Sequence, residues 1–321
     1  MITIYVHEHG ETNRAPKVDP AWLEPASDVR LWVDVVAPGP EEGRLLSDVF
    51  RFHPLSVEDA LSAIHHPKIE AYPGYLYLIL HGIDFDNRRG GFATRDVDFF
   101  LGRNSLVTVH DGHSRSIAAL KAICEEHEHV LAEGPAALLH RIVDRMVDNY
   151  RPEIDALEDH IDELEEGAIL GDRQDLIRHI LNIKRDLASL RRVVLPQRDA
   201  VGRLARREFP QISDEITYRF RDVYDHFVRM SEEAILFQDR VTSILEAHLA
   251  AISNRLNVVM KVLTVISTIF LPLTVLTGMW GMNIPLPMFP GADAAQFWWV
   301  GGVMATIAAG MLTLFWWKRW M

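Results

Sequence analysis

The sequence has few of the residues and motifs that secreted proteins and most enzymes need. A single cysteine, Cys124, excludes an internal disulfide and a cysteine-based zinc cluster, and it favours a cytosolic location for the charged part of the chain. Residues 1–6 have neither a basic segment nor an apolar core, so we expect no secretory signal peptide. Without a phosphate-cradling Gly-Lys-Ser/Thr loop, a nucleophile elbow or an HExxH spacing, a membrane-anchored hydrolase is disfavoured, and we expect no enzyme.

Positive charge is also in short supply. The chain has 33 Lys and Arg against 45 Asp and Glu, a formal net charge of −12. A nucleic-acid binder needs a basic surface, so we expect no nucleic-acid partner. An acidic surface is compatible with gathering cations, but most acidic proteins have no such role.

Two long apolar runs lie near the C-terminus, at residues 258–282 and 297–317. Each is long enough to cross a bilayer, which needs about 20 residues. Basic residues flank the outer ends of the two runs (Arg255, Lys261, Lys318 and Arg319), and the connecting loop 284–296 has none. The positive-inside rule therefore predicts a multi-pass protein of the cell (inner) membrane with both termini cytoplasmic and the loop outside. Tryptophans mark the ends of the spans: Trp280, Trp298, Trp299, Trp316, Trp317 and Trp320.

Residues 1–132 read as a mixed α/β cytoplasmic domain. Short β-branched or aromatic segments predict strands at 2–6, 31–36, 75–79, 96–101 and 105–110. Helices are expected at 40–50 and 56–63, the second capped by Ser56. The histidines of this region have no metal-site spacing and read as scattered surface and core residues.

Residues 133–212 are predicted to form acidic stem helices. One long helix is expected from Pro135 to about 167–171, and a second from about Asp172 to Pro196 or a little beyond. The first has many acids on one side, which indicates a solvated face or a surface that raises the local cation concentration.

Residues 213–283 are predicted to form one long helix that includes the first span, with Ser213 as its N-cap. Its apolar residues follow a seven-residue repeat. The repeat fits either a coiled-coil-like assembly or packing on the protein's own second helix. The repeat residues are Ile216, Phe220, Val223, Phe227, Met230, Ala234, Phe237, Val241 and Ile244.

A second, more polar set of residues has the same spacing on this helix; we call it the polar stripe. In the span it comprises Asn257, Met260, Thr264, Ser267, Leu271, Thr274 and Gly278. Towards the cytoplasm it continues through Ser253, Ala250, Glu246, Ser243, Asp239, Leu236 and Glu232. Polar groups on a membrane helix can join neighbouring helices, but a continuation into three acids favours a water-facing, pore-lining side. One helix cannot enclose a pore, so several copies are required.

The motif Gly281-Met282-Asn283 between the spans, preceded by segments 261–264 and 269–274, resembles the CorA magnesium transporters, also called two-transmembrane GxN transporters. Weaker matches at 53–59, 66–70 and 220–226 extend the resemblance over nearly the whole chain. It implies a funnel-shaped homopentamer with an α/β cytoplasmic domain, a long helical stem and two transmembrane helices. It also implies uptake of Mg²⁺, often with Co²⁺ or Ni²⁺, with Mg²⁺ both transported and regulatory and no organic cofactor.

The resemblance also implies roles for single residues. Gly281, Met282 and Asn283 would form the external selectivity filter. The pore would be lined by Asn257, Met260, Leu263, Ser267, Leu271, Thr274 and Gly278, which differs from the polar stripe only in Leu263 against Thr264. Intracellular Mg²⁺ would close the channel by binding between Asp86 (or Asp84) of one subunit and Glu246 of the next.

The external loop departs from the family pattern. Many members have an acid after the motif, whereas Asp293 is the only acid here in residues 284–296. A ring of acids that concentrates external cations is therefore not expected. The alternative is a zinc transporter on the same scaffold, with or without proton coupling. A structural or receptor coiled coil is disfavoured, because two spans and a polar stripe exceed what an anchor needs.

Overall fold

A computed structural model describes residues 1–24, 26–62, 66–83, 94–126, 129–170, 175–282 and 293–318. The chain divides into two compact units, Met1–Ile244 and Leu245–Met321, which are taken in turn. Unit 1 holds a sheet with its covering helices, and unit 2 holds the apolar C-terminal helices.

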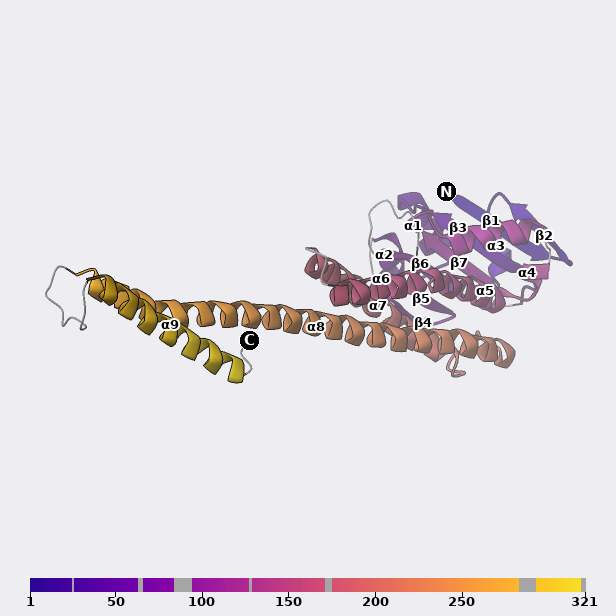
Figure 1. Cartoon of the computed structure of the whole chain (residues 1–321). Coiled ribbons are helices and arrows are strands. Elements are labelled where there is room, and N and C mark those ends of the chain that lie inside the picture. Colours follow the sequence, from indigo (N-terminus) through magenta and orange to yellow (C-terminus); the bar gives the residue numbers. More distant parts are fainter. Residues whose placement is uncertain are drawn as a thin grey trace. The chain divides into compact units, whose positions relative to one another are not determined.

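The first unit contains a seven-stranded sheet in the order β2-β1-β3-β7-β6-β5-β4 (Figure 1). Neighbouring strands are antiparallel except for the parallel pair β3 and β7. A parallel pair needs a long crossover, and here the chain between β3 and β7 supplies helices and three further strands. The strands are β1 (Ile2–Glu8), β2 (Glu11–Ala15), β3 (Arg30–Val36), β4 (Lys68–Tyr72), β5 (Tyr75–Ile83), β6 (Thr94–Leu101) and β7 (Ser105–His110).

All strands predicted from the sequence are present, but β2 and β4 were missed. Both have few apolar residues, since β2 reads ETNRA and β4 reads KIEAY. The turn before β5 supplied a usable signal. Tyr72 pairs with Tyr75 across Pro73-Gly74, and Gly74 has φ +93°, a conformation that glycine adopts without strain.

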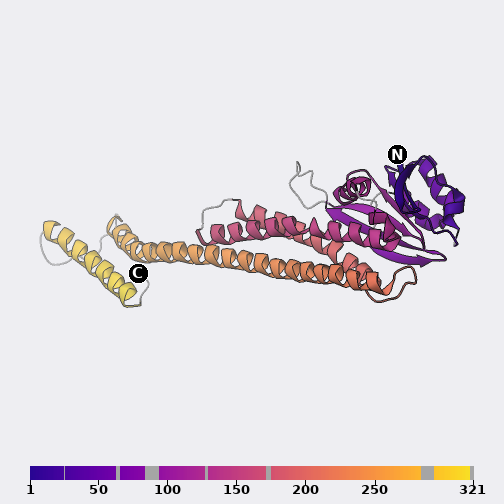
Figure 2. The same ribbon diagram turned by 90° about the vertical axis from the view of Figure 1, so that its right-hand side faces the viewer.

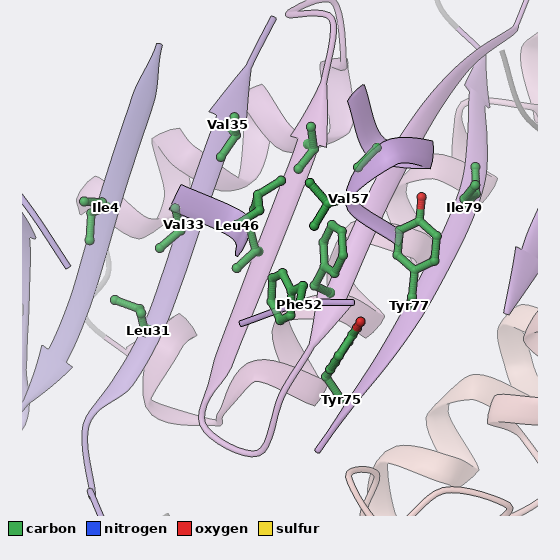
Figure 3. Close-up of a cluster of buried hydrophobic side chains, with 14 of the residues drawn as sticks. Ile4, Leu31, Val33, Val35, Leu46, Phe52, Val57, Tyr75, Tyr77 and Ile79 are labelled. Carbon is green, nitrogen blue, oxygen red and sulfur yellow. The ribbon is translucent and has the colours of Figure 1, made fainter. Parts of the chain in front are cut away.

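One face of the sheet carries the main apolar core. Figure 3 shows its side chains gathered over β1, β3, β7, β6 and β5. Phe52 lies at the centre, with its ring 4.3 Å from Phe100 and 4.6 Å from Tyr75 between centroids. Three short helical segments lie between β3 and β4: α1 (Pro40–Arg44), the π-helical turn η2 (Leu45–Val49) and α2 (Pro54–Leu61). They contribute Leu46, Val57 and Ala60 to this core.

The expected cap of α2 was wrong by three residues. The N-cap is His53, whose ring Nδ1 accepts a hydrogen bond from the Leu55 amide at 3.2 Å. Pro54 follows at the first helical position, where the missing N–H costs nothing. Ser56 instead donates to the His53 carbonyl at 2.9 Å and contacts the Tyr75 hydroxyl at 2.8 Å.

The opposite face of the sheet buries a polar network. Asp34 is fully buried, accepts from Thr108 Oγ1 at 2.5 Å and forms an ion pair with Lys121. His110 Nδ1 accepts from the Gly112 amide at 3.0 Å, which assigns the proton of a neutral ring to Nε2, 3.1 Å from Asp34 Oδ1. Burial raises the pKa of Asp34, but the contacts with His110, Lys121 and Thr108 outweigh burial and lower it.

Helices α3 (Arg115–Glu126), α4 (His129–Ala132) and α5 (Pro135–Asp148) come next, with α6 (Arg151–Leu170) after a break. The prediction of one helix from Pro135 to about residue 170 was therefore wrong. Pro152 is the second residue of α6, and a proline there cannot continue the preceding helix without clashing with the carbonyl four residues back. At the break, the buried Tyr150 hydroxyl donates to the His81 carbonyl at 2.7 Å and accepts from Gln197 at 2.9 Å.

Helix α7 (Leu176–Leu204) continues through Pro196, and α8 (Asp214–Trp280) is one unbroken helix (Figure 2). Ser213 Oγ accepts from the Ile216 amide at 3.4 Å, as its predicted capping role requires. Every member of the seven-residue repeat is buried within unit 1. The repeat therefore packs within unit 1, where the Phe220 ring lies against His140 of α5 and the Phe227 ring against Tyr150. One of the two interpretations had placed this packing on the second stem helix.

Unit 2 contains the end of α8 and the whole of α9 (Asp293–Trp317). Both helices are long and apolar enough to span a membrane. Val265 is the single buried residue among the described residues of this unit. In isolation unit 2 has almost no core of its own.

Candidate ion-conduction site

The polar stripe lies on α8 as the spacing predicts, and its side chains are exposed. Exposure alone does not distinguish the stripe from the rest of the span, because most residues of the span are exposed in a single chain. The exceptions share one side of the helix: Lys261, Val265, Ile269, Pro272, Leu273 and Leu276 are wholly or partly covered. At 3.6 residues per turn, the stripe is centred roughly 130° around the axis from Val265. The stripe therefore lies away from the side that contacts within the chain cover. All eight residues predicted to line the pore are exposed: Asn257, Met260, Leu263, Thr264, Ser267, Leu271, Thr274 and Gly278.

The threonines of the stripe have a defined hydrogen-bond geometry. Thr264 Oγ1 donates to the Met260 carbonyl at 2.8 Å, and Thr274 Oγ1 donates to the Phe270 carbonyl at 2.8 Å. The hydroxyl proton is then used inside the helix, and the oxygen keeps its lone pairs for an outside donor. Water molecules around a cation point their hydrogens outward. The two hydroxyls therefore present acceptors that suit a hydrated cation.

Helix α8 ends at Trp280, directly before the Gly281-Met282-Asn283 motif and the loop 284–296. The Gly281 amide donates to the Thr277 carbonyl at 2.9 Å, and the Met282 amide donates to the Met279 carbonyl at 3.3 Å. Both residues are exposed. Asn283, the third residue of the predicted filter, lies outside the described residues. The structure thus places Gly281 and Met282 in the first turn beyond the helix.

The cytoplasmic part of the stripe is also exposed. Glu232, Asp239 and Glu246 all face outward from α8. Asp84 and Asp86, the proposed partners of Glu246 on a neighbouring copy, lie outside the described residues. Among the described residues there is no group of three or more His, Cys, Asp or Glu side chains that could hold a metal ion. The predicted regulatory site stays a prediction.

The acids of α6 form the solvated face that their sequence pattern indicated. Asp162 and Glu165 are exposed, and Arg240 of α8 donates to them at 2.6 Å and 2.8 Å. Arg151 contacts Asp155 at 2.9 Å and Glu233 of α8 at 3.1 Å. The pairs of Arg240 with α6 and of Arg151 with Glu233 join α6 and α8 within unit 1, whereas the Arg151–Asp155 pair lies within α6. All of them offset part of the acidic charge there.

Asp98, a buried acid, was not predicted from the sequence. Asp98 on β6 is 5 % exposed and accepts a hydrogen bond from the Tyr77 hydroxyl at 2.5 Å. Burial raises the pKa of Asp98 to about 7, and nearby Asp96 and Asp59 add to the increase. A usable signal was present, because an aspartate stands inside the apolar run Val97-Asp98-Phe99-Phe100-Leu101. A charged residue there requires either a partner or a site.

The α/β sheet, the long helix and two apolar helices define a class of protein: a membrane protein with two transmembrane helices and a large domain outside the bilayer. The model of the CorA-like Mg²⁺ transporter protein family matches residues 27–319. The chain belongs to this family of transporters and is not an enzyme.

Individual relatives agree with this assignment. YfjQ of Bacillus subtilis, which carries the name of a metal ion transporter, is 32% identical over 308 residues, or 96% of this chain and 92% of YfjQ. The cobalt/magnesium transport protein CorA of Thermotoga maritima is 30% identical over 281 residues, or 86% of this chain and 79% of that protein. The structure of the CorA magnesium transporter from Methanocaldococcus jannaschii has a TM-score of 0.83, at 21% identity, and covers 100% of this chain and 99% of that one. The last comparison confirms the fold over the full length.

Proposed function

We propose that the chain assembles into a homopentameric channel that imports Mg²⁺ through a pore lined by the polar stripe. The observation that carries the proposal is the one-sided stripe of α8, which turns acceptor oxygens away from the covered side of the span. Such a stripe is unfavourable against lipid. Copies arranged around an axis would place it against water.

Family membership supports Mg²⁺ as the ion, and the names of relatives support Mg²⁺ and Co²⁺. Mg²⁺ loses its hydration water reluctantly. A ring of neutral Asn283 amide oxygens at the external mouth can bind the water shell without holding the ion too tightly to leave. A ring of carboxylates at that place would bind the ion more strongly and slow its release.

The membrane potential supplies the driving force in this proposal. Two positive charges gain about 4.6 kcal/mol per 100 mV when they move inward. Both termini are cytoplasmic, so residues 1–132 and the stem 133–212 act on the inner side. Intracellular Mg²⁺ bound between Asp84 or Asp86 of one copy and Glu246 of the next would close the pore.

A second candidate is a zinc transporter on the same scaffold, with or without proton coupling. The loop favours it, because Asp293 is the only acid in residues 284–296 and a ring of acids outside the pore is therefore missing. A Mg²⁺ channel that attracts its ion mainly by external acids would not have such a loop. The two candidates share the pore and differ in the ion.

The test of the pore assignment is growth of a strain that lacks its own Mg²⁺ transporters. Wild-type protein should restore growth at low Mg²⁺, and Asn283→Ala should not, because the ring of amide oxygens is lost. Asn254→Ala is the matched control, since Asn254 is exposed on the same helix but off the stripe. Normal growth with Asn283→Ala at equal expression would refute the assignment.

A further inference from the structure

Between its two covered parts, α8 passes through a stretch that its own chain leaves open. Every residue from 249 to 260 is exposed. The buried repeat ends at Ile244, and the covered side of the span begins at Lys261. Most of this stretch precedes the apolar run 258–282, on the cytoplasmic side of the predicted span, where lipid tails do not cover it. Large apolar side chains on a helix in water indicate a surface for another protein.

Such side chains lie along one side of the stretch, and we call them the apolar ridge. The ridge consists of Leu249, Ile252 and Leu256, which are 52 %, 40 % and 60 % exposed. Steps of three and four residues place them on one side of the helix, and the next step reaches Val259 at the start of the span. This is the spacing of helices that pack side by side in a coiled coil.

A second apolar row lies on the other side of the polar stripe, and we call it the small row. It consists of Ala247, Ala251 and Val258, all of which are exposed. At 3.6 residues per turn, the ridge lies about a quarter of a turn to one side of the stripe and the small row about a third of a turn to the other. The stripe is thus flanked by large apolar residues on one side and by small ones on the other.

The remaining side of the stretch, opposite the stripe, is polar. It carries His248 and Arg255, which continue the side on which the buried repeat lies in unit 1. Packing of α8 on its own chain through that side therefore does not extend into this stretch. A helix immersed in lipid would also be apolar there. The uncovered apolar surface is confined to the two flanks of the stripe.

A closed ring of copies uses both flanks. In such a ring each copy contacts one neighbour on each side, through two different surfaces. When the stripes face a common axis, the ridge of one copy faces the small row of the next. Large side chains opposite small ones interdigitate, and small residues let the two helices approach closely. Ridges that faced each other would leave the small rows uncovered.

We propose that the apolar ridge of one copy packs against the small row of the neighbouring copy and forms a helix seam on the cytoplasmic side of the membrane. The proposal rests on the proposed pore, because the pore turns the stripes towards one axis. It adds the partner surface on each flank of the stripe. The seam would also close the wall of the pore between adjacent helices at its cytoplasmic end.

The first experiment measures assembly of the full-length protein in detergent by native mass spectrometry over a range of protein concentrations. Leu256→Asn should raise the concentration of half-dissociation at least about tenfold, since burial of one leucine side chain changes an equilibrium constant by about that factor. Leu181→Asn is the matched control, because Leu181 of α7 is 55 % exposed and lies outside the seam. It should assemble like the wild type, and circular dichroism should show that both variants fold.

Cross-linking then identifies the surfaces that meet. Cys124 is the only cysteine of the chain, so Cys124→Ser provides a background without thiols. Separately tagged chains with Leu249→Cys and with Ala247→Cys should be joined by a short bismaleimide after co-expression. Chains with Leu249→Cys and with Arg255→Cys should not be joined, because Arg255 lies on the polar side away from both flanks.

The outcomes separate the seam from the pore. A monomeric wild type would overturn both proposals. An assembled wild type with no cross-link at Ala247, or with Leu256→Asn as strongly assembled as Leu181→Asn, would overturn the seam and leave the pore to the growth test of Asn283→Ala. Quenching of a fluorophore on Leu249→Cys by brominated lipid, in protein without the cross-link, would overturn the seam as well and would show that the bilayer covers the ridge.

Discussion

The two halves of α8 contain similar apolar residues, but these residues are buried in the first half and exposed in the second. In unit 1 Phe227 is 1 % exposed, and it belongs to a repeat that is buried throughout. In unit 2 Phe270 is 61 % exposed, and most of the span around it is exposed as well. The first unit makes its own core, whereas the described apolar surface of the second is open to lipid and, in the proposed channel, to further copies. The N-terminal part of α8 therefore belongs to a folded domain outside the bilayer, and its C-terminal part belongs to the membrane.

Two patterns with the same spacing run along α8. The buried repeat and the polar stripe run along the same helix with the same spacing, yet the repeat stops at Ile244 while the stripe continues to Gly278. The repeat is a packing pattern of one chain. Among the described residues the stripe lies away from the covered side of the span, and in the proposed channel it would line the pore.

The largest expected effect comes from the same substitution made in both halves. Phe227→Ala should reduce the free energy of unfolding of unit 1 by about 3–5 kcal/mol, because it leaves a cavity in a close-packed seam. Phe270→Ala removes an exposed ring and should change that free energy by less than about 0.5 kcal/mol. Denaturant unfolding of the full-length protein in detergent, followed by the circular dichroism of unit 1, measures both. Equal losses of unfolding free energy would contradict the claim that α8 is buried in a core in unit 1 and exposed in unit 2.

A smaller effect concerns Asp98, the acid buried on β6 of unit 1. Burial raises the pKa of Asp98 to about 7, above its value in the unfolded chain. The contribution of Asp98 to stability is therefore fully present below the unfolded pKa and is lost as the pH rises through about 7. Asp98→Asn does not titrate, so its stability relative to wild type should increase by about 2–3 kcal/mol between pH 5 and pH 8. Thermal unfolding at both pH values, with Asp28→Asn as the control, measures the change; a difference independent of pH would mean that Asp98 is ionised throughout.

The smallest expected effect sharpens the role of the stripe. Thr274→Val removes one acceptor oxygen from it and should slow ion uptake about three- to tenfold, as expected for the loss of roughly 1 kcal/mol. Thr313 of α9 makes the same bond to the carbonyl four residues earlier, at 2.9 Å to Ala309, but does not belong to the stripe. Thr313→Val should leave uptake near the wild-type rate. If both variants lose uptake equally, the hydroxyls act through helix structure and not through the pore.

Much of the fold could be predicted from sequence because its elements have strong periods. The two spans, α8 and the apolar strands follow from patterns of residues along one element. Strand β4 and the break at Tyr150 could not be found that way. Strand β4 is held by pairing with β5, and Arg203 of α7 donates to its Ile69 carbonyl at 3.0 Å. Tyr150 is held by a carbonyl on β5 and a glutamine on α7.

The candidate sites differ in the same way. The polar stripe was predictable because a single helix carries it. The buried pair of Asp98 and Tyr77 was not, because β5 and β6 bring the two side chains together only in the folded unit. An aspartate in an apolar strand indicated that something was needed, but not which partner supplied it.

The most direct test of the central claim is ion uptake into liposomes that contain only the purified protein. With an inside-negative membrane potential and no pH gradient, radiolabelled Mg²⁺ should accumulate, and Asn283→Ala should abolish the uptake. The same vesicles should take up Zn²⁺ more slowly, with or without a pH gradient. Uptake of Zn²⁺ that requires a pH gradient, with no uptake of Mg²⁺ under either condition, would contradict the account and favour a proton-coupled zinc transporter.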